Sequence, residues 1–431
     1  MSAMGKRLFE GWPLWLIPLP YLVFGIVAGV AFPRIELAYF PAFAHIVSVG
    51  SAQAYLSAMS SGTITLTALV FSVMFMMLQM TMSAYSKRLI MLFSGHPLSL
   101  HALGVFSATF LCSLGTLQFV DRNHDGRVPW LSMEFATALL VVSMVFLTLL
   151  IQRAALLRIT HVLQFVGHRG RTVIAKLLPP LEGSAAGEVA TLRLKADAIR
   201  TQVPQQRVAY DGVPLAIANF RIDDFVQLAK EASGTIVIKC GVGDTVAQGT
   251  VLLEVYGTQA LIPEGVLLQG IVLAPERAFE RDPKYPLRLL VDTAIMALSP
   301  AVNDPTTAVQ AIDQIQDLLH RLGSRVLEAG VVNDAQGDLR LVFPMPTWEE
   351  YLSLAFDEIR IYGSSTLQVL RRMRSALIDL AGSLQDSARV AAVQKYLEHL
   401  NAMVERSDLD AFDRALALQG DPQGLGHTRP P

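Results

Sequence analysis

Residues 133–151, MEFATALLVVSMVFLTLLI, decide the class of fold that this chain can adopt. A helix that crosses the apolar core of a bilayer, about 30 Å thick, needs about 20 largely apolar residues, because a charge or an unpaired peptide group there is costly. This segment contains no Lys or Arg, and its acidic residue, Glu134, lies near one end. The segment therefore predicts a membrane-spanning helix.

Three similar windows precede this segment in the first third of the chain, at residues 14–32, 63–82 and 98–120, and none contains Lys or Arg. The whole chain has a mean hydropathy of +0.41 and only 17% charged residues, an unusual combination for a soluble protein. We therefore expect a transmembrane domain over residues 1–160, with four spans numbered in chain order. The alternative, four very apolar core helices in a soluble protein, is disfavoured.

Positive residues in the short connections predict which side of the membrane each connection faces. The basic clusters before span one, after span two and after span four fall on one side, which we predict to be the cytoplasm. The other connections contain Arg34 with Glu36, and Arg122 and Arg127 balanced by acids. Both termini are therefore expected in the cytoplasm. The clusters consist of Lys6, Arg7, Lys87, Arg88, Arg153, Arg158, Arg169, Arg171 and Lys176.

Span two carries a polar stripe along one helical face. Its members recur at steps of three, four or seven residues: Ser61, Thr65, Ala68, Ser72, Gln79, Ser83 and Ser86. Lipid disfavours the amide of Gln79, so the stripe should meet other helices or water. Close helix packing is the favoured interpretation. The alternative is a pore that several copies form, with Phe75 and Met76 as its constriction and Lys87 and Arg88 at its cytoplasmic mouth.

The connection between spans three and four contains half of a calcium-binding loop. Asp121, Asn123 and Asp125 alternate as in the first part of an EF-hand loop, and Gly126 permits the sharp bend that such a loop needs. However, the position that should supply a bidentate acid is Ser132. Weak calcium binding is one hypothesis, and a plain polar turn is the favoured alternative.

The remainder of the chain divides into segments by composition and periodicity. Residues 161–205 are expected to form a juxtamembrane helix and linker, and residues 206–275 a β-rich module. Residues 276–418 follow as a mostly helical domain, and residues 419–431, rich in Gly and Pro, as a disordered tail. The predicted fold class is therefore a four-helix membrane protein with a cytoplasmic α+β domain.

The β-rich module looks like the hammerhead fold of biotinyl and lipoyl domains, because residues 234–256 are short strands punctuated by glycine. Those carriers attach their cofactor to a lysine, but Gly257, Thr258 and Gln259 stand at the corresponding hairpin. No cofactor is therefore expected.

Two turn signals predict β-hairpins, one at Asp211-Gly212 and one over residues 333–337. The strands would be residues 206–210 with 213–217, and residues 326–332 with 338–343.

Five helices are predicted in the helical domain, at residues 286–298, 305–322, 348–361, 366–381 and 388–403. Asp304 precedes Pro305 as an N-cap, and Thr347 with Glu350 fits a capping box.

A polar turn separates the first two of these helices and contains Ser299, Asn303, Asp304 and Thr306. The helix that follows could offer its N-terminus to an anion or ligand. Capping of that helix by the same side chains is the favoured alternative.

No catalytic constellation is visible. A phosphate-binding glycine loop, a nucleophile elbow and paired histidines at metal-ligand spacing are all missing from the sequence. Cys112 and Cys240 lie far apart in different segments, so a disulfide is not expected. The net charge of −2 differs from the strongly basic charge that is typical of proteins that bind nucleic acid. We therefore expect a protein that is not an enzyme and has the lipid bilayer as its first partner.

Several stretches together resemble the bacterial family of predicted membrane proteins catalogued as domain of unknown function 2254. The stretches are residues 60–65, 70–72 with Gln79, 297–308 and 359–363, and residues 299–307 are the most specific. The resemblance implies an inner-membrane protein of uncharacterised role, and it adds Arg360 and Tyr362 to the candidate binding turn. Residues 121–126 look like an addition to the family pattern, which puts a shared calcium role in doubt.

Two functional hypotheses follow. The first is a homo-oligomeric channel or transport-like protein whose cytoplasmic domain assembles or gates it, as the stripe on span two suggests. The second is a membrane-anchored sensor or scaffold whose cytoplasmic domain binds a ligand or partner.

Overall fold

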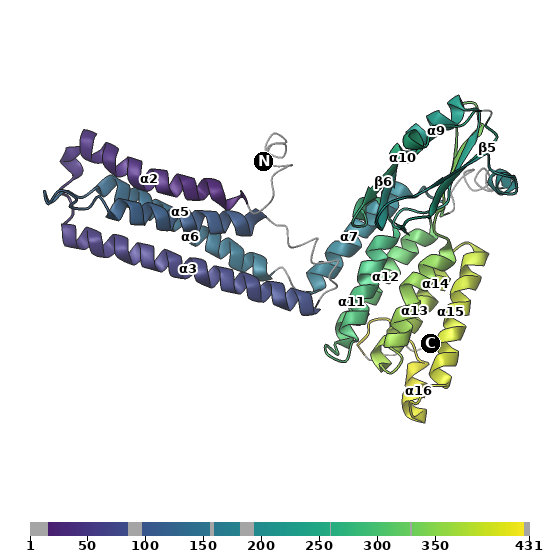
Figure 1. Cartoon of the computed structure of the whole chain (residues 1–431). Coiled ribbons are helices and arrows are strands. Elements are labelled where there is room, and N and C mark those ends of the chain that lie inside the picture. The colour runs from purple at the N-terminus through teal and green to yellow at the C-terminus, as the bar shows by residue number, and fades with distance from the viewer. Residues whose placement is uncertain are drawn as a thin grey trace. The chain divides into compact units, whose positions relative to one another are not determined.

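The computed structural model describes residues 16–84, 97–155, 159–181, 194–258, 260–327 and 330–425. The chain forms two compact units, Met1–Arg158 and Ile159–Pro431. Figure 1 labels the long helices of both units and some strands of the second unit.

In the described residues, the first unit is built from four long helices: α2 (Pro18–Tyr39), α3 (Val49–Ala84), α5 (Pro97–Leu117) and α6 (Trp130–Ala155). A short 3-10 helix, η2 (Pro41–Phe43), follows α2. Each of the four is long and apolar enough to cross a membrane. The prediction of four membrane helices followed by a region of helices and sheets is therefore confirmed.

Helix α3 begins at Val49, well before the predicted start of span two at Thr63. Its first turns are rich in Ser, Gly and Ala, which lowers the hydropathy of the segment. Ala52 and Leu56 are nevertheless fully buried, in a cluster with Val128 at one end of the unit. Because this surface packs on protein, the helix needs no run of large apolar residues there.

Helix α2 extends to Tyr39, beyond the predicted end of span one at Phe32, and includes Pro33. Glu36, which was predicted to lie in a connection, is therefore helical and only 4% exposed. Its carboxylate accepts hydrogen bonds from the backbone nitrogens of Leu131 and Ser132 at the start of α6. These donors offset the cost of burying the charge.

Helices α2 and α5 approach closely through small residues. A Cβ atom added at Gly25 would lie 2.6 Å from the backbone oxygen of Ala108, and one at Gly29 would lie 2.9 Å from that of Cys112. Membrane helices associate mainly by such close packing, because lipid gives them no hydrophobic driving force. The spacing of Gly25 and Gly29, four residues apart, therefore serves packing within the chain.

Buried hydroxyl pairs also join the helices of the first unit. Ser60 Oγ of α3 lies 3.0 Å from Ser113 Oγ of α5, and Thr109 Oγ1 of α5 lies 2.9 Å from Ser143 Oγ of α6. Each hydroxyl pair places a polar contact between two spans, where an unpaired group would be costly.

The second unit contains two β-sheets in the described residues, with strand orders β1-β5-β3-β8-β7 and β4-β2-β6. Apolar side chains from both sheets share one buried core. The strands are β1 (Gln206–Ala209), β2 (Leu215–Phe220), β3 (Thr235–Ile238), β4 (Thr245–Val246), β5 (Val251–Tyr256), β6 (Ile271–Ala274), β7 (Val331–Asn333) and β8 (Leu339–Val342).

The hairpin predicted at Asp211-Gly212 is wrong, because the two strands that it would join lie in different sheets. Strand β1 pairs with β5, whereas β2 pairs with β4 and β6. The Tyr210 hydroxyl crosses the turn instead and donates to the Val213 carbonyl at 2.8 Å. A turn signal reverses the chain locally, but burial decides which strand becomes the partner.

The hairpin predicted over residues 333–337 is confirmed, since β7 pairs antiparallel with β8. Strand β8 also pairs in parallel with β3, with Ile236 opposite Leu341. The larger sheet therefore includes strands from the segment that was expected to be mostly helical. The hammerhead assignment stays a prediction.

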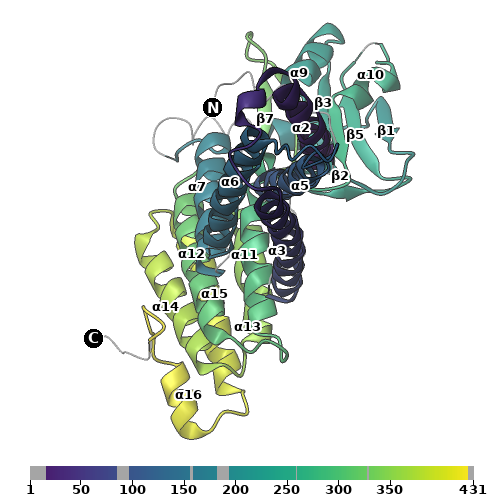
Figure 2. The ribbon, with the colours of Figure 1, turned by 90° about the vertical axis from the view of Figure 1, so that its left-hand side faces the viewer.

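Helices α11 to α15 agree with the five predicted positions in 276–418 to within a few residues, whereas α16 was not predicted. Asp304 caps α12, and Thr347 with Glu350 forms the predicted capping box of α13. Helices α11 to α15 lie side by side (Figure 2). The elements are α7 (Ile159–Leu177), α9 (Ile222–Glu231), α10 (Glu264–Gln269), η3 (Phe279–Arg281), α11 (Lys284–Ala297), α12 (Pro305–Gly323), α13 (Trp348–Tyr362), α14 (Leu367–Ser383), α15 (Ser387–Glu405) and α16 (Ala411–Ala417).

Residues 419–425 differ from the disordered tail that their composition predicts. The Gln419 carbonyl accepts a hydrogen bond from Arg371 Nε, and the Gly424 carbonyl accepts one from Gln368 Nε2. Asp421 is only 1% exposed. Side chains of α14 thus donate hydrogen bonds to the backbone carbonyls of this segment. The Gly and Pro content of the segment does not indicate these contacts. Residues 426–431 lie outside the described part.

Candidate functional site

The polar stripe on α3 faces away from the helices of its own unit. Ser61, Thr65, Ala68 and Ser72 are exposed. The hydroxyl of Thr65 donates to the Ser61 carbonyl at 2.8 Å, and that of Ser72 donates to the Ala68 carbonyl at 2.9 Å. These bonds satisfy the hydroxyl protons without any neighbouring helix. The side chains of Gln79 and Ser83, and all of Ser86, Lys87 and Arg88, lie outside the described residues.

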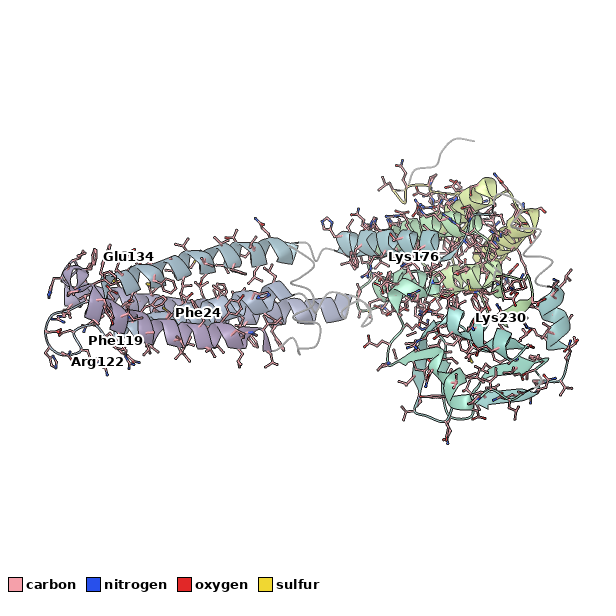
Figure 3. The ribbon with its side chains drawn as sticks, turned by 90° about the horizontal axis from the view of Figure 1, so that it is seen from above. Phe24, Phe119, Arg122, Glu134, Lys176 and Lys230 are labelled. Atoms are coloured by element: carbon pink, nitrogen blue, oxygen red, sulfur yellow. The ribbon has the colours of Figure 1, made fainter. Side chains whose placement is uncertain are left out.

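The calcium-loop candidates form a tight turn held by their own side chains. Asp121 Oδ1 accepts from the Gly126 nitrogen at 2.9 Å, and Asp125 Oδ1 accepts from the Arg127 nitrogen at 3.2 Å. Asn123 lies exposed in the same turn. Figure 3 shows Phe119 and Arg122 together at this end of the first unit, where the guanidinium lies 4.9 Å from the ring centroid.

In the described residues, this turn included, no group of three or more His, Cys, Asp or Glu side chains is placed to hold a metal ion. Calcium binding by the turn stays a prediction.

The polar turn before α12 uses its side chains for capping. Asp304 accepts from the Thr307 nitrogen at 3.1 Å and from the Thr307 hydroxyl at 2.6 Å. Ser299 Oγ donates to the Met296 carbonyl at 2.7 Å, and Asn303 has a φ of +48° that closes the turn. Thr306 is exposed. The favoured capping interpretation therefore accounts for the contacts of this turn.

Arg360 and Tyr362 lie at the C-terminal end of α13. Arg360 Nη1 lies 3.5 Å from Met403 Sδ of α15, and Tyr362 is 54% exposed. Among the described residues, no hydrogen bond or ion pair joins these two side chains to the turn at Ser299.

A pocket of about 900 Å³ opens in the second unit, at a place that the sequence analysis did not indicate. Most of its lining lies where a strand or loop leads into a helix, so that α9, α11 and α13 all begin at its edge. The lining segments are residues 177–179 at the end of α7, 219–224, 241–242 with 244, 281–284, 343–346 and Glu350.

Asp282 is the most unusual side chain of this pocket, because it is only 1% exposed and half of its carboxylate lacks a partner. Oδ1 accepts from the Lys284 nitrogen at 2.9 Å, at the start of α11. Oδ2 has no hydrogen-bond partner among the described residues. Burial raises the pKa of Asp282, and the nearby charge of Asp244 raises it further, against the opposing effects of Lys284 and Arg277.

Two neighbours define the surroundings of this carboxylate. Gly243 has a φ of +89°, and a Cβ atom there would collide with Asp282 Oδ2, so both backbone and space require glycine. Tyr351 of α13 is fully buried, and its hydroxyl also has no partner in the described chain. Burial and the charge of Asp282 both raise the pKa of this phenol.

The lining as a whole is acidic. Five carboxylates and three basic side chains line the pocket, and Arg221 pairs with Asp224 at 3.8 Å. Asp244 Oδ2 accepts from the Gly241 nitrogen at 2.7 Å. The carboxylates are Asp223, Asp224, Asp244, Asp282 and Glu350, and the basic groups are Arg221, Arg281 and Lys284.

Sequence reasoning missed this pocket because each of its parts looks like an ordinary local signal. The sequence of residues 241–244 is typical of a turn, and Asp282-Pro283 is typical of a helix start. The one unusual local feature is the density of Pro and Asp at the helix starts, which does not by itself indicate a cavity.

The comparisons with known proteins agree with the membrane character of the chain. A family model described as "Predicted membrane protein (DUF2254)" matches residues 13–379. Uncharacterized proteins of Mycobacterium bovis and of Mycobacterium tuberculosis strain H37Rv are each 28% identical over 425 residues, covering 94% of this chain and 78% of the relative. No solved structure matches the chain significantly. The chain therefore belongs to the DUF2254 family of predicted membrane proteins.

Proposed function

We propose that this protein is a membrane-anchored sensor, in which the four helices of the first unit hold a ligand-binding second unit at the bacterial inner membrane. The observation that carries the proposal is the pocket with the buried, half-unpaired carboxylate of Asp282. An unsatisfied buried polar group costs stability, so its retention calls for a functional explanation, such as a ligand nearby that compensates its charge. The basic residues that follow span four support a cytoplasmic second unit.

The position of α7 supports a sensing role over simple storage. Leu177 and Leu178, at the end of α7, line the pocket, and α7 is the first described helix after span four. Arg171 of α7 donates to Asp317 Oδ2 of α12 at 2.8 Å, so α7 is held to α12 within the second unit. A ligand in the pocket would therefore touch the helix that follows the membrane spans in the chain.

The proposal is tested by filling the pocket. A Cβ atom at Gly241 would meet Asp244 Oδ2 at 3.4 Å and Pro344 Cγ at 3.8 Å, so Gly241→Leu can occupy the pocket without a backbone clash. Gly382 of α14 has nothing within 4 Å of an added Cβ, which makes Gly382→Leu the matched control. Detergent-purified protein is screened by thermal unfolding against a library of small polar and charged metabolites.

We expect compounds that raise the Tm of the wild type and of Gly382→Leu but not that of Gly241→Leu, because only bound ligand stabilises the native state by mass action. Compounds that stabilise all three proteins equally would place binding outside the pocket and count against the proposal.

A second function, the homo-oligomeric pore, is favoured by one observation. Ser61, Thr65 and Ser72 face away from the described helices of their own unit, which leaves them open to contact with another copy, lipid or water. If copies place this face around an axis, Ser72→Leu should close the path and abolish ion flux into liposomes. Flux that Ser72→Leu leaves unchanged, or a wild type that is silent across ions and voltages, would exclude the pore.

A further inference from the structure

The lining of the pocket carries negative charge that the described residues do not fully compensate. Asp282 has an unpaired oxygen, and Asp244 lies close enough for its charge to act on Asp282. Lys284 and Arg277 offset part of this charge, but neither forms an ion pair with Asp282 in the described residues. Charges act strongly on one another where little water screens them.

The pocket is poorly suited to an anionic ligand, although three helices begin at its edge. The Lys284 nitrogen at the start of α11 is already bonded to Asp282, and the Glu350 nitrogen of α13 is bonded to the Thr347 hydroxyl. The first turn of α9 carries Asp223 and Asp224. The free donors and positive potential that helix N-termini offer to anions are therefore largely used or cancelled.

The pocket is also poorly suited to a bare metal ion. Asp244 and Asp282 are close enough to interact by charge, but no group of three or more suitable ligands exists in the described residues. The lining also has an apolar part, which includes Leu178, Phe220, Val242 and Phe343. Ligand pockets commonly combine an apolar wall with a few oriented polar groups.

We propose that the pocket binds an organic cation, an amine or guanidinium with an apolar body, whose charge lies over Asp244 and Asp282 and whose body lies on the apolar wall. This inference rests on the proposed ligand-binding function and names the chemical class of the ligand. Asp282 acts as the buried counter-charge, and Asp244, which is half-buried, is the carboxylate that the ligand can reach.

The test uses the full chain in a neutral detergent and three probes that share one apolar body: 4-phenylbutylamine, 4-phenylbutanol and 4-phenylbutyrate. Equilibrium dialysis gives the Kd of each probe, and the signal of Gly241→Leu is subtracted to remove binding to detergent. We expect the amine to bind at least about tenfold more tightly than the alcohol, and the carboxylate to bind more weakly than both.

A variant tests the role of the buried charge. Asp282→Asn should reduce amine binding by about tenfold and leave alcohol binding unchanged, because it removes a charge and not the wall. Asp408→Asn, an exposed position outside the pocket, is the matched control and should change neither. The probe ranking on the wild type decides the proposal even if Asp282→Asn does not fold.

The outcomes separate the two proposals. If the alcohol or the carboxylate binds as tightly as the amine and Gly241→Leu abolishes that binding, the pocket binds ligands but the cation assignment is wrong. If no probe binds in a way that depends on Gly241, the cation proposal is overturned, and the library screen still decides the sensor proposal.

Discussion

Glu36 Oε2 of α2 accepts two hydrogen bonds from Ser132 at the start of α6, one from the backbone nitrogen at 2.8 Å and one from the hydroxyl at 2.7 Å. Oε1 accepts a third bond from the Leu131 nitrogen at 2.7 Å. The carboxylate therefore caps α6 from a different helix. Its position at the N-terminus of α6 is also favourable because that end of the helix dipole is positive. It ties the first span to the fourth.

The first prediction concerns this cap. Glu36→Gln removes the charge and turns one acceptor into a donor that faces N–H groups, so it should destabilise the first unit by about 1–3 kcal/mol. Glu134→Gln, at an exposed position of α6, is the control and should change stability little. Unfolding in mixed detergent micelles measures both. Equal stability of the two variants would show that the cap contributes nothing.

The second prediction concerns the contact between α2 and α5. Gly25→Ala should destabilise the unit by about 1–3 kcal/mol, because the new methyl group meets the Ala108 backbone, which cannot rotate away. Gly62→Ala is the matched control, since nothing lies within 4 Å of an added Cβ there. The control should be neutral or slightly stabilising through helix propensity. The same unfolding measurement would contradict us if Gly25→Ala were as stable as Gly62→Ala.

The third prediction is the pH dependence of stability that Asp282 causes. Burial raises the folded pKa above the ordinary value of 3.8, so the folded state disfavours the ionised form. The resulting penalty is absent below that ordinary value and grows as the pH rises through the folded pKa. Asn cannot ionise, and its Oδ1 can still accept from the Lys284 nitrogen.

Without ligand, Asp282→Asn should therefore raise the Tm at about pH 8, and the gain should shrink towards about pH 4. Thermal unfolding of the wild type, Asp282→Asn and Asp408→Asn across this pH range measures whether Asp282→Asn raises or lowers the Tm. A variant that loses stability at the higher pH would mean that Asp282 is stabilised as a charge.

The fourth prediction concerns orientation. In a background with Cys240→Ser, a cysteine at His124 should react with a membrane-impermeant maleimide on intact cells, because the acid-balanced connection is expected outside. A cysteine at Asp408 should react only after lysis. Cys112, which is 1% exposed within α5, should stay silent in both. Labelling at Asp408 in intact cells would reverse the proposed topology.

Local sequence signals account for much of the second unit. Thr347 and Glu350 form the capping box that their spacing predicts, and Asp304 caps α12 as expected. These features depend on residues within one helical turn of each other, so the sequence already contains both partners. The same holds for the hairpin of β7 and β8, whose turn and strands are contiguous.

The pairing of strands that lie far apart in the sequence could not be predicted in the same way. The turn at Asp211-Gly212 is a strong hairpin signal, yet β1 pairs with β5 because both strands bury apolar side chains in the shared core. Likewise, β8 joins β3 in parallel, a pairing that links segments about a hundred residues apart, as the bond from Thr235 Oγ1 to the Leu339 carbonyl illustrates.

The sequence by itself determined that this protein has four membrane-length helices, because four apolar runs without Lys or Arg suit a bilayer, where a charge or an unpaired peptide group is costly. Only the tertiary structure decided where the polar groups went. It buried Glu36 against the start of α6, turned the stripe of α3 outward, and left Asp282 half-paired in the lining of a pocket. Burial and pairing are properties of neighbours in space, and neighbours in space are set by packing of the whole chain.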